Sequence, residues 1–196
     1  MSRIVAGRAG GRRLQMPAGE ATRPTSDRVR EAFFTALASW NGSADAAVEQ
    51  HLAGIAFLDL YAGSGAVGLE AASRGASPVW LVEHDERAAR VARANVGATR
   101  LGATVVQRRV QSLLATEPDQ VFDVVWLDPP YPVGTDEVEK VVEQVFAGGW
   151  VASDGVVVIE RSTRAVPPRF DHHEQWHRKY GETTVYWVAA RAEELE

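Results

Sequence analysis

The chain has 196 residues, of which 45% are hydrophobic, so it can bury the core of one domain and is not a disordered polypeptide. It contains no cysteine, which excludes disulfides, thiolate catalysis and cysteine-ligated zinc. The net charge of −5 is unevenly distributed, because residues 1–30 hold seven arginines and two acidic residues and carry +5, which leaves −10 for the rest.

The first residues lack the apolar segment of a secretion signal. No stretch approaches the roughly 18 consecutive apolar residues of a membrane-spanning helix. We therefore expect a cytoplasmic protein without a membrane partner.

Residues 1–25 are predicted to form a basic arm that binds a polyanion. Two short apolar stretches, 4–5 and 12–14, flank three glycines, a pattern typical of a small hairpin. All the basic residues in this region are arginines, whose planar guanidinium fits phosphate and stacks on bases. The alternative is an ordinary solvated surface. The predicted nucleic-acid contacts are Arg3, Arg8, Arg12, Arg13, Arg23 and Arg28.

Residues 26–196 are predicted to form one α/β domain. Ser26 is typical of a helix N-cap, and the helix should run to about Trp40. Beyond it, apolar strands alternate with helices, which indicates a doubly wound, mostly parallel sheet covered on both faces. The predicted strands are 55–60, 79–82, 104–107, 122–127 and 156–159, and the predicted helices are 65–74, 86–96, 112–115 and 136–146. A final pair of segments, 175–179 and 183–188, predicts an antiparallel hairpin at the sheet edge.

The turn after the first of these strands is a glycine loop, residues 59–68, which read DLYAGSGAVG. Glu83 closes the next strand, twenty residues after Gly63. On spacing alone this also describes a dinucleotide site. A pyrophosphate, however, is bound by amide groups and a helix N-terminus, whereas Asp59 places a carboxylate at the loop entrance. The ammonium and sulfonium groups of S-adenosylmethionine suit Asp59, and its ribose hydroxyls suit Glu83.

Asp128-Pro129-Pro130-Tyr131 follows the fourth core strand. This sequence is ordinary turn chemistry, but it also suits a planar base that bears an exocyclic amine. The Asp128 carboxylate and the Pro129 carbonyl can each accept a hydrogen from the amine, and the ring of Tyr131 can stack on the base. We predict Asp128, Pro129 and Tyr131 to be the catalytic residues.

The glycine loop and Asp128 should lie together, because the first and fourth core strands are neighbours in a doubly wound sheet and ligands bind beyond the carboxyl ends of its strands. Together the two motifs favour S-adenosylmethionine over a dinucleotide. No metal site is predicted, because the five histidines show no ligand spacing. The predicted cofactor contacts are Asp59, Tyr61, Ala62, Gly63, Ser64, Gly65, Glu83, His84 and Asp128.

The chain resembles the ribosomal RNA small subunit methyltransferase D family, the guanine-N2 methyltransferases of bacterial small-subunit rRNA. The residues that carry the resemblance are 3–7, 23–31, 59–75, 128–131 and the terminal hairpin, and the RPTSDRVRE block at 23–31 is the most specific. The resemblance implies a class I methyltransferase fold with S-adenosylmethionine as donor. It also implies, as acceptor, a guanine of 16S rRNA within the 30S subunit or its assembly intermediate. We expect a monomer.

One position departs from related enzymes, which often place a small polar pair after the third core strand. Here Arg109-Val110 stands there, and we expect the backbone of Val110 to contact the adenine. Two other functions remain open. A DNA adenine-N6 methyltransferase uses the same Asp-Pro-Pro-Tyr chemistry but usually needs an additional target-recognition domain. A non-catalytic RNA-binding assembly factor has no use for Asp128 and Tyr131.

Overall fold

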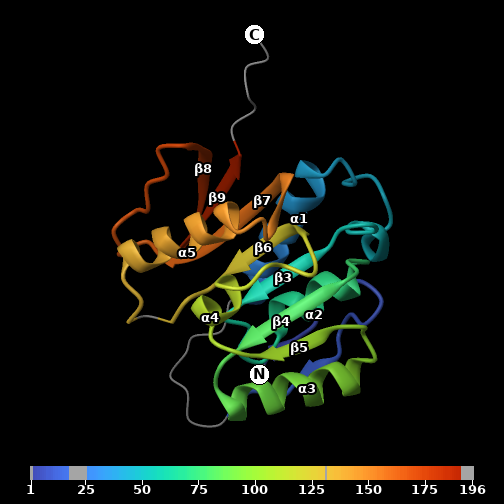
Figure 1. Ribbon diagram of the computed structural model, residues 1–196. Helices are drawn as coiled ribbons and strands as arrows, with labels where there is room; N and C mark the ends of the chain where they lie inside the picture. Colours follow the sequence, from blue (N-terminus) through green and yellow to red (C-terminus); the bar gives the residue numbers. More distant parts are fainter. Residues whose placement is uncertain (1, 18–25, 131, 191–196) are drawn as a thin grey trace.

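The computed structural model describes residues 2–17, 26–130 and 132–190. A central sheet is built from β3 (Phe57–Leu60), β4 (Val79–Glu83), β5 (Thr104–Gln107), β6 (Phe122–Leu127), β7 (Val151–Ser162), β8 (His173–Tyr180) and β9 (Thr183–Ala190). The strand order is β5-β4-β3-β6-β7-β9-β8 (Figure 1). The strands from β5 to β7 are parallel, and β9 pairs antiparallel with both β7 and β8. The sheet predicted from the sequence, with its antiparallel terminal hairpin, is thus confirmed.

Helices cover both faces of this sheet: α1 (Asp27–Trp40), α2 (Ala66–Ser73), α3 (Glu86–Thr99), α4 (Val110–Leu114) and α5 (Thr135–Ala147). Two separate apolar clusters show how the layers are divided, because α1, α2 and part of α3 pack on one face and α4 and α5 on the other. Within β6, Val124 and Trp126 belong to the first cluster, and Val125 and Leu127 to the second. This alternation is what a strand buried on both faces requires. In the described residues no helix is long and apolar enough to cross a membrane.

The ends of two elements show which boundaries the sequence pattern predicts and which it does not. Helix α1 begins as predicted, with the Ser26 hydroxyl accepting a hydrogen bond from the Val29 amide at 3.3 Å. Strand β7, however, spans Val151–Ser162 rather than 156–159. Only Val151 and Gly155 of its added residues are buried, so these residues lack a regular apolar pattern. Val151 nevertheless pairs with β6, and residues 160–162 pair with β9. Tertiary pairing therefore extends this strand beyond its hydrophobic centre.

The N-terminal segment forms the predicted small hairpin, in which β1 (Ser2–Arg3) pairs with β2 (Arg13–Leu14). This hairpin is not separate from the α/β core. Ile4, Ala9 and Leu14 are buried, and they belong to the same apolar cluster as α1 and α2. The basic arm expected at residues 1–25 is thus, for its described residues 2–17, folded onto the domain that follows it.

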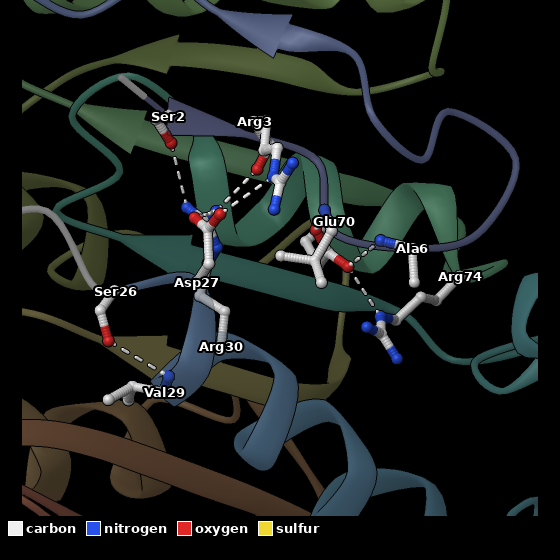
Figure 2. Close-up of polar contacts among 10 residues, drawn as sticks. Ser2, Arg3, Ala6, Ser26, Asp27, Val29, Arg30, Glu70 and Arg74 are labelled. Carbon is white, nitrogen blue, oxygen red and sulfur yellow. Dashed lines mark hydrogen bonds and ion pairs between the residues drawn. The ribbon is translucent and has the colours of Figure 1, made fainter.

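Buried polar contacts fix the hairpin to α2. Glu70 is fully buried and accepts a hydrogen bond from the amide of Val5 at 2.6 Å. It accepts a second from the amide of Ala6 at 3.0 Å (Figure 2). It also pairs with Arg74 Nε at 2.9 Å. A buried carboxylate with three donors is compensated for the loss of water, whereas the removal of one partner would leave a costly unpaired charge. Glu70 therefore holds the hairpin in one position.

A second buried group joins the hairpin to α1. The guanidinium of Arg30 donates to the Ser2 hydroxyl at 3.2 Å, to the Arg3 carbonyl at 2.6 Å and to Asp27 Oδ1 at 2.7 Å (Figure 2). Burial lowers the pKa of Arg30, and the charge of Asp27 opposes that shift. Because Arg3 Nε also contacts Asp27, at 3.1 Å, the start of α1 and the first strand form one polar network.

Candidate functional site

A cleft of about 1370 Å³ opens at the carboxyl ends of β3, β4, β6 and β7. Strands β3 and β6 are adjacent and in register, with Leu60 opposite Leu127. The segments that follow these two residues therefore meet at one edge of the sheet. Most of the predicted site residues line this cleft: Asp59, Tyr61, Ala62, Gly63, Ser64, Glu83, His84, Asp128 and Pro129.

Four hydrogen bonds hold the glycine loop: one lies within the loop, two come from β4 and one comes from α3. The Gly63 amide donates to Glu83 Oε2 at 2.9 Å, and the Gly65 amide donates to the Ala62 carbonyl at 2.7 Å. The Ala62 amide in turn donates to the Val82 carbonyl at 2.9 Å, and the Ser64 carbonyl accepts from Asn95 Nδ2 at 2.9 Å. Gly65 has φ +80°, and a Cβ there would lie 2.9 Å from the Leu81 side chain, so the position requires glycine. These contacts define the path of the loop past the cleft.

Asp59 stabilises the start of α2 from the end of β3. Its side chain is 1% exposed, and Oδ2 accepts the Gly68 amide at 2.9 Å. A Cβ at Gly68 would collide with the Leu81 side chain, so glycine allows the helix to approach this carboxylate closely. Burial raises the pKa of Asp59 to about 7; the Gly68 hydrogen bond opposes this shift, and the charge of Glu83 adds to it. A cation in the cleft would relieve this unfavourable burial.

Glu83 is the second carboxylate of the cleft. One oxygen accepts the Gly63 amide, and the other accepts the Asp85 amide at 2.7 Å and lies 3.2 Å from His84 Nδ1. A carboxylate has about four lone-pair directions. Glu83 can therefore support the loop and still accept hydrogen bonds from a ligand.

Tyr61 has an unusual backbone and a buried hydroxyl. Its φ of +65° lies in the left-handed region, which is uncommon for a residue with a side chain. Its hydroxyl is buried and makes no hydrogen bond within the described structure. Burial, followed by the charge of Glu137, raises the pKa of Tyr61 to about 12, so the phenol is neutral at physiological pH. A strained residue with an unsatisfied hydroxyl at a cleft is typical of a functional position.

Asp128 follows β6, whose last residue, Leu127, pairs with Ile159 of β7, and Arg161 lies two residues further along β7. Burial lowers the pKa of Arg161, and the nearby charge of Asp128 opposes that shift. Arg161 Nη2 also donates to the Val133 carbonyl at 3.0 Å, which fixes the loop that leaves Asp128-Pro129-Pro130. Tyr131, predicted to stack on the base, lies outside the described residues.

Other predicted residues lie away from the cleft. Gly65 shapes the loop without lining the cavity, and Val110 is 4% exposed at the start of α4, where it packs into the second apolar cluster. Among the predicted nucleic-acid contacts, only Arg28 of the described residues lines the cleft. Arg23 lies outside the described residues.

The remaining arginines are exposed on or beside the hairpin. Arg3 pairs with Asp27, Arg8 Nη2 donates to the Ala72 carbonyl at 2.8 Å, and Arg12 Nη1 donates to the Ala98 carbonyl at 2.6 Å. Arg13 is exposed in β2. Arg8 and Arg12 thus attach the hairpin to α2 and α3 while remaining on the surface.

The sequence analysis missed several residues that line the cleft, among them Glu160, Arg161, Arg164 and Lys179. It also missed Asn95, which lies outside the cleft but binds the glycine loop. Arg161 could have been found, because it lies two residues after the apolar run 156–159 of a parallel strand, near the strand end where open α/β sheets place functional groups. Asn95 carries no such signal, since its partners Gln15 and Ser64 are distant in the sequence and only the folded chain brings them together.

Comparison with known proteins identifies the relatives of the chain. The family described as conserved hypothetical protein 95 matches residues 2–189. The ribosomal RNA small subunit methyltransferase D of Escherichia coli K12 is 32% identical over 178 residues, which are 90% of this chain and 83% of that protein. The protein of the same name from Haemophilus influenzae is 30% identical over 81% of this chain and 77% of its own length.

Two solved structures share the architecture. A hypothetical protein of Thermus thermophilus superposes with a TM-score of 0.79 at 33% identity, covering 97% of this chain and all of the other. The 16S rRNA N2 methyltransferase RsmC of the same organism, in complex with AdoMet and guanosine, has a TM-score of 0.63 at 22% identity over 89% of this chain and 44% of its own. The fold is therefore that of a class I methyltransferase, as predicted. The chain belongs to the ribosomal RNA small subunit methyltransferase D family.

Proposed function

We propose that this protein transfers a methyl group from S-adenosylmethionine to the exocyclic N2 of a specific guanine in 16S rRNA. The substrate is the 30S subunit or its assembly intermediate, and the enzyme acts as a cytoplasmic monomer. The observation that carries the proposal is that one cleft holds both the glycine loop with its two carboxylates and the Asp128-Pro129 segment on the adjacent strand. The names of the relatives support RNA as the substrate.

The acceptor-rich lining of the loop end of the cleft fits S-adenosylmethionine. Asp59 and Glu83 suit a ligand with positive charge and hydroxyl donors, because a cation beside Asp59 would stabilise its charged form and offset the burial that raises its pKa. Asp59 would face the charged methionine portion, Glu83 the ribose, and the loop from Ala62 to Ser64 the body of the ligand. When bound, S-adenosylmethionine supplies an electrophilic methyl group.

Asp128 and Pro129 prepare the acceptor. The lone pair of a guanine amine is delocalised into the ring, so the nitrogen must become pyramidal before it can attack. The Asp128 carboxylate and the Pro129 carbonyl accept the two amine hydrogens and favour that form, and Asp128 can take the proton that the nitrogen releases. Alignment of the reacting atoms can supply roughly 7–11 kcal/mol of the barrier reduction. Tyr131 would stack on the base, worth about 1–3 kcal/mol in comparable sites.

The RNA around the target guanine is bound by the hairpin arginines and by Arg28 at the cleft. A base inside a helix cannot enter the cleft, so the target guanine lies in a loop or is flipped out. Arg28 is the link between the two regions, because it is exposed on α1 and lines the cleft.

The decisive experiment measures transfer of a tritiated methyl group to 30S particles, naked 16S rRNA and duplex DNA, with the product nucleoside identified by mass spectrometry. We expect N2-methylguanosine in the rRNA of one or both ribosomal substrates and no product in DNA. N6-methyladenine in DNA would instead establish the adenine methyltransferase function. Binding of 30S particles without transfer to any substrate would establish an assembly factor.

A further inference from the structure

Asn95 of α3 connects the N-terminal hairpin to the glycine loop. Its side-chain oxygen accepts the Gln15 amide at 2.8 Å, and its side-chain nitrogen donates to the Gln15 carbonyl at 3.0 Å and the Ser64 carbonyl at 2.9 Å. The residue is 1% exposed. Both hydrogens and the oxygen of the amide are thus used, and one buried group satisfies two segments that are far apart in the sequence.

We propose that Asn95 is a positioning residue that couples the seating of the N-terminal hairpin to the affinity of the glycine loop for S-adenosylmethionine. The inference rests on the proposed function of the cleft as the cofactor site. The buried side-chain amide of Asn95 can keep all three hydrogen bonds only while both segments are in place. A buried polar group that loses its hydrogen-bond partner destabilises the folded protein. Displacement of Gln15 therefore disturbs the group that orients the Ser64 carbonyl.

The orientation of that carbonyl matters because it belongs to the peptide unit between Ser64 and Gly65. The amide at the other end of the unit donates to the Ala62 carbonyl at 2.7 Å and closes the loop turn. Ser64 and its neighbours Gly63 and Ala62 line the cleft. The Asn95 contact thus acts on the segment that would touch the cofactor, although Asn95 itself does not line the cavity.

The coupling is reciprocal. A ligand that tightens the loop stabilises the hairpin through Asn95, and a ligand that binds the hairpin alters the affinity of the loop by the same factor. Arg12 Nη1 strengthens this connection, because it binds the Ala98 carbonyl near the end of the same helix α3. Binding of RNA to the hairpin arginines and binding of cofactor in the cleft would then each change the affinity for the other.

Ser73 provides a matched second variant. It is fully buried at the end of α2 and also holds the hairpin by two side-chain bonds, accepting the Ala9 amide at 2.9 Å and donating to the Ala6 carbonyl at 2.6 Å. Its hydrogen bonds reach the hairpin and not the glycine loop. Ser73→Ala therefore loosens the hairpin without removing a bond from the cofactor segment.

The test compares Asn95→Ala, Ser73→Ala and the double variant by calorimetry with S-adenosylhomocysteine and by thermal unfolding, without RNA. We expect all three variants to unfold at lower temperature. Asn95→Ala should bind the ligand about 3- to 10-fold more weakly, as the loss of one buried hydrogen bond predicts. Ser73→Ala should weaken binding only where Asn95 is present, because the loosened hairpin acts on the loop through that residue. Unchanged affinity in Asn95→Ala or in Ser73→Ala, or an equal effect of Ser73→Ala with and without Asn95, would overturn the proposal.

Hydrogen exchange of the wild-type protein gives a second readout that needs no variant. Addition of S-adenosylhomocysteine should slow amide exchange in residues 2–15 if the coupling exists, and unchanged exchange there would overturn it. Binding of 30S particles with and without the same ligand then tests the RNA arm. Absence of 30S binding would refute the proposed RNA substrate, whereas the two RNA-free measurements would still decide the role of Asn95.

Discussion

Asp59 lowers the stability of the free protein at neutral pH but suits the binding of a cationic ligand. Its pKa of about 7 in the folded state, against an ordinary value of 3.8, means that the folded protein retains a proton that the unfolded chain releases between these values. The contribution of Asp59 to stability is therefore full below pH 4, declines as pH rises toward 7 and stays low above it. A carboxylate buried at this cost suits a cationic ligand.

Asp59→Asn separates these two effects, because the amide oxygen still accepts the Gly68 amide while the charge is removed. We expect the free variant to be more stable than wild type at pH 8, by a few kcal/mol at most for a shift of this size, and the difference to vanish near pH 4. S-adenosylmethionine should bind it more weakly at pH 8. Thermal unfolding at the two pH values and calorimetry with S-adenosylmethionine test this prediction. If the variant and the wild type were equally stable at pH 8, the buried charge of Asp59 would not destabilise the free protein.

Asp128→Ala should abolish methyl transfer and leave cofactor affinity nearly intact. The reason is its place after β6, at the end of the cleft proposed for the base, beside Arg161 rather than within the glycine loop. A turnover assay with 30S particles and calorimetry with S-adenosylmethionine decide the matter. Near-normal turnover would remove Asp128 from the mechanism.

Glu83→Ala should weaken S-adenosylmethionine binding by ~1–3 kcal/mol, because a ligand hydroxyl loses a charged acceptor. The same change removes the acceptor of the Gly63 amide, so part of the effect comes from the loop. Glu83→Gln keeps an oxygen for one partner and should give an intermediate affinity. The dissociation constants of the three proteins test this order, and NAD should bind none of them.

At the scale of elements, the hairpin is both a packed part of the core and the proposed carrier of RNA affinity. Replacing Arg8, Arg12 and Arg13 together by alanine should lower the salt slope of RNA binding by roughly 0.7 for each lost contact. Arg8 and Arg12 also bind helix carbonyls, so the unfolding temperature of the variant must be measured alongside. Binding of 16S rRNA across a salt series gives the slopes, and identical slopes would place the RNA on another surface.

For the whole molecule, the order and type of the core elements could be predicted because their apolar runs are long and regular. The glycine loop and Asp128 could also be placed together, since neighbouring parallel strands end at one sheet edge. The attachment of the hairpin to the core could not be predicted, because Glu70 and Arg30 are charged residues that a sequence pattern assigns to the surface, whereas both are buried. Their burial becomes reasonable only when the partners from the first six residues are known.

The position of β9 has a consequence for folding. Strand β9 lies inside the sheet between β7 and β8, and the ring of its Trp187 lies 5.6 Å from that of Phe33 in α1. The edge of β7 that leads to Arg161 is therefore unpaired until residues 183–190 have been made and have joined the sheet. A shortened chain that lacks these residues would leave this edge open, so the cleft wall around Arg161 depends on a strand that enters the sheet after the strands on both sides of the glycine loop have been made.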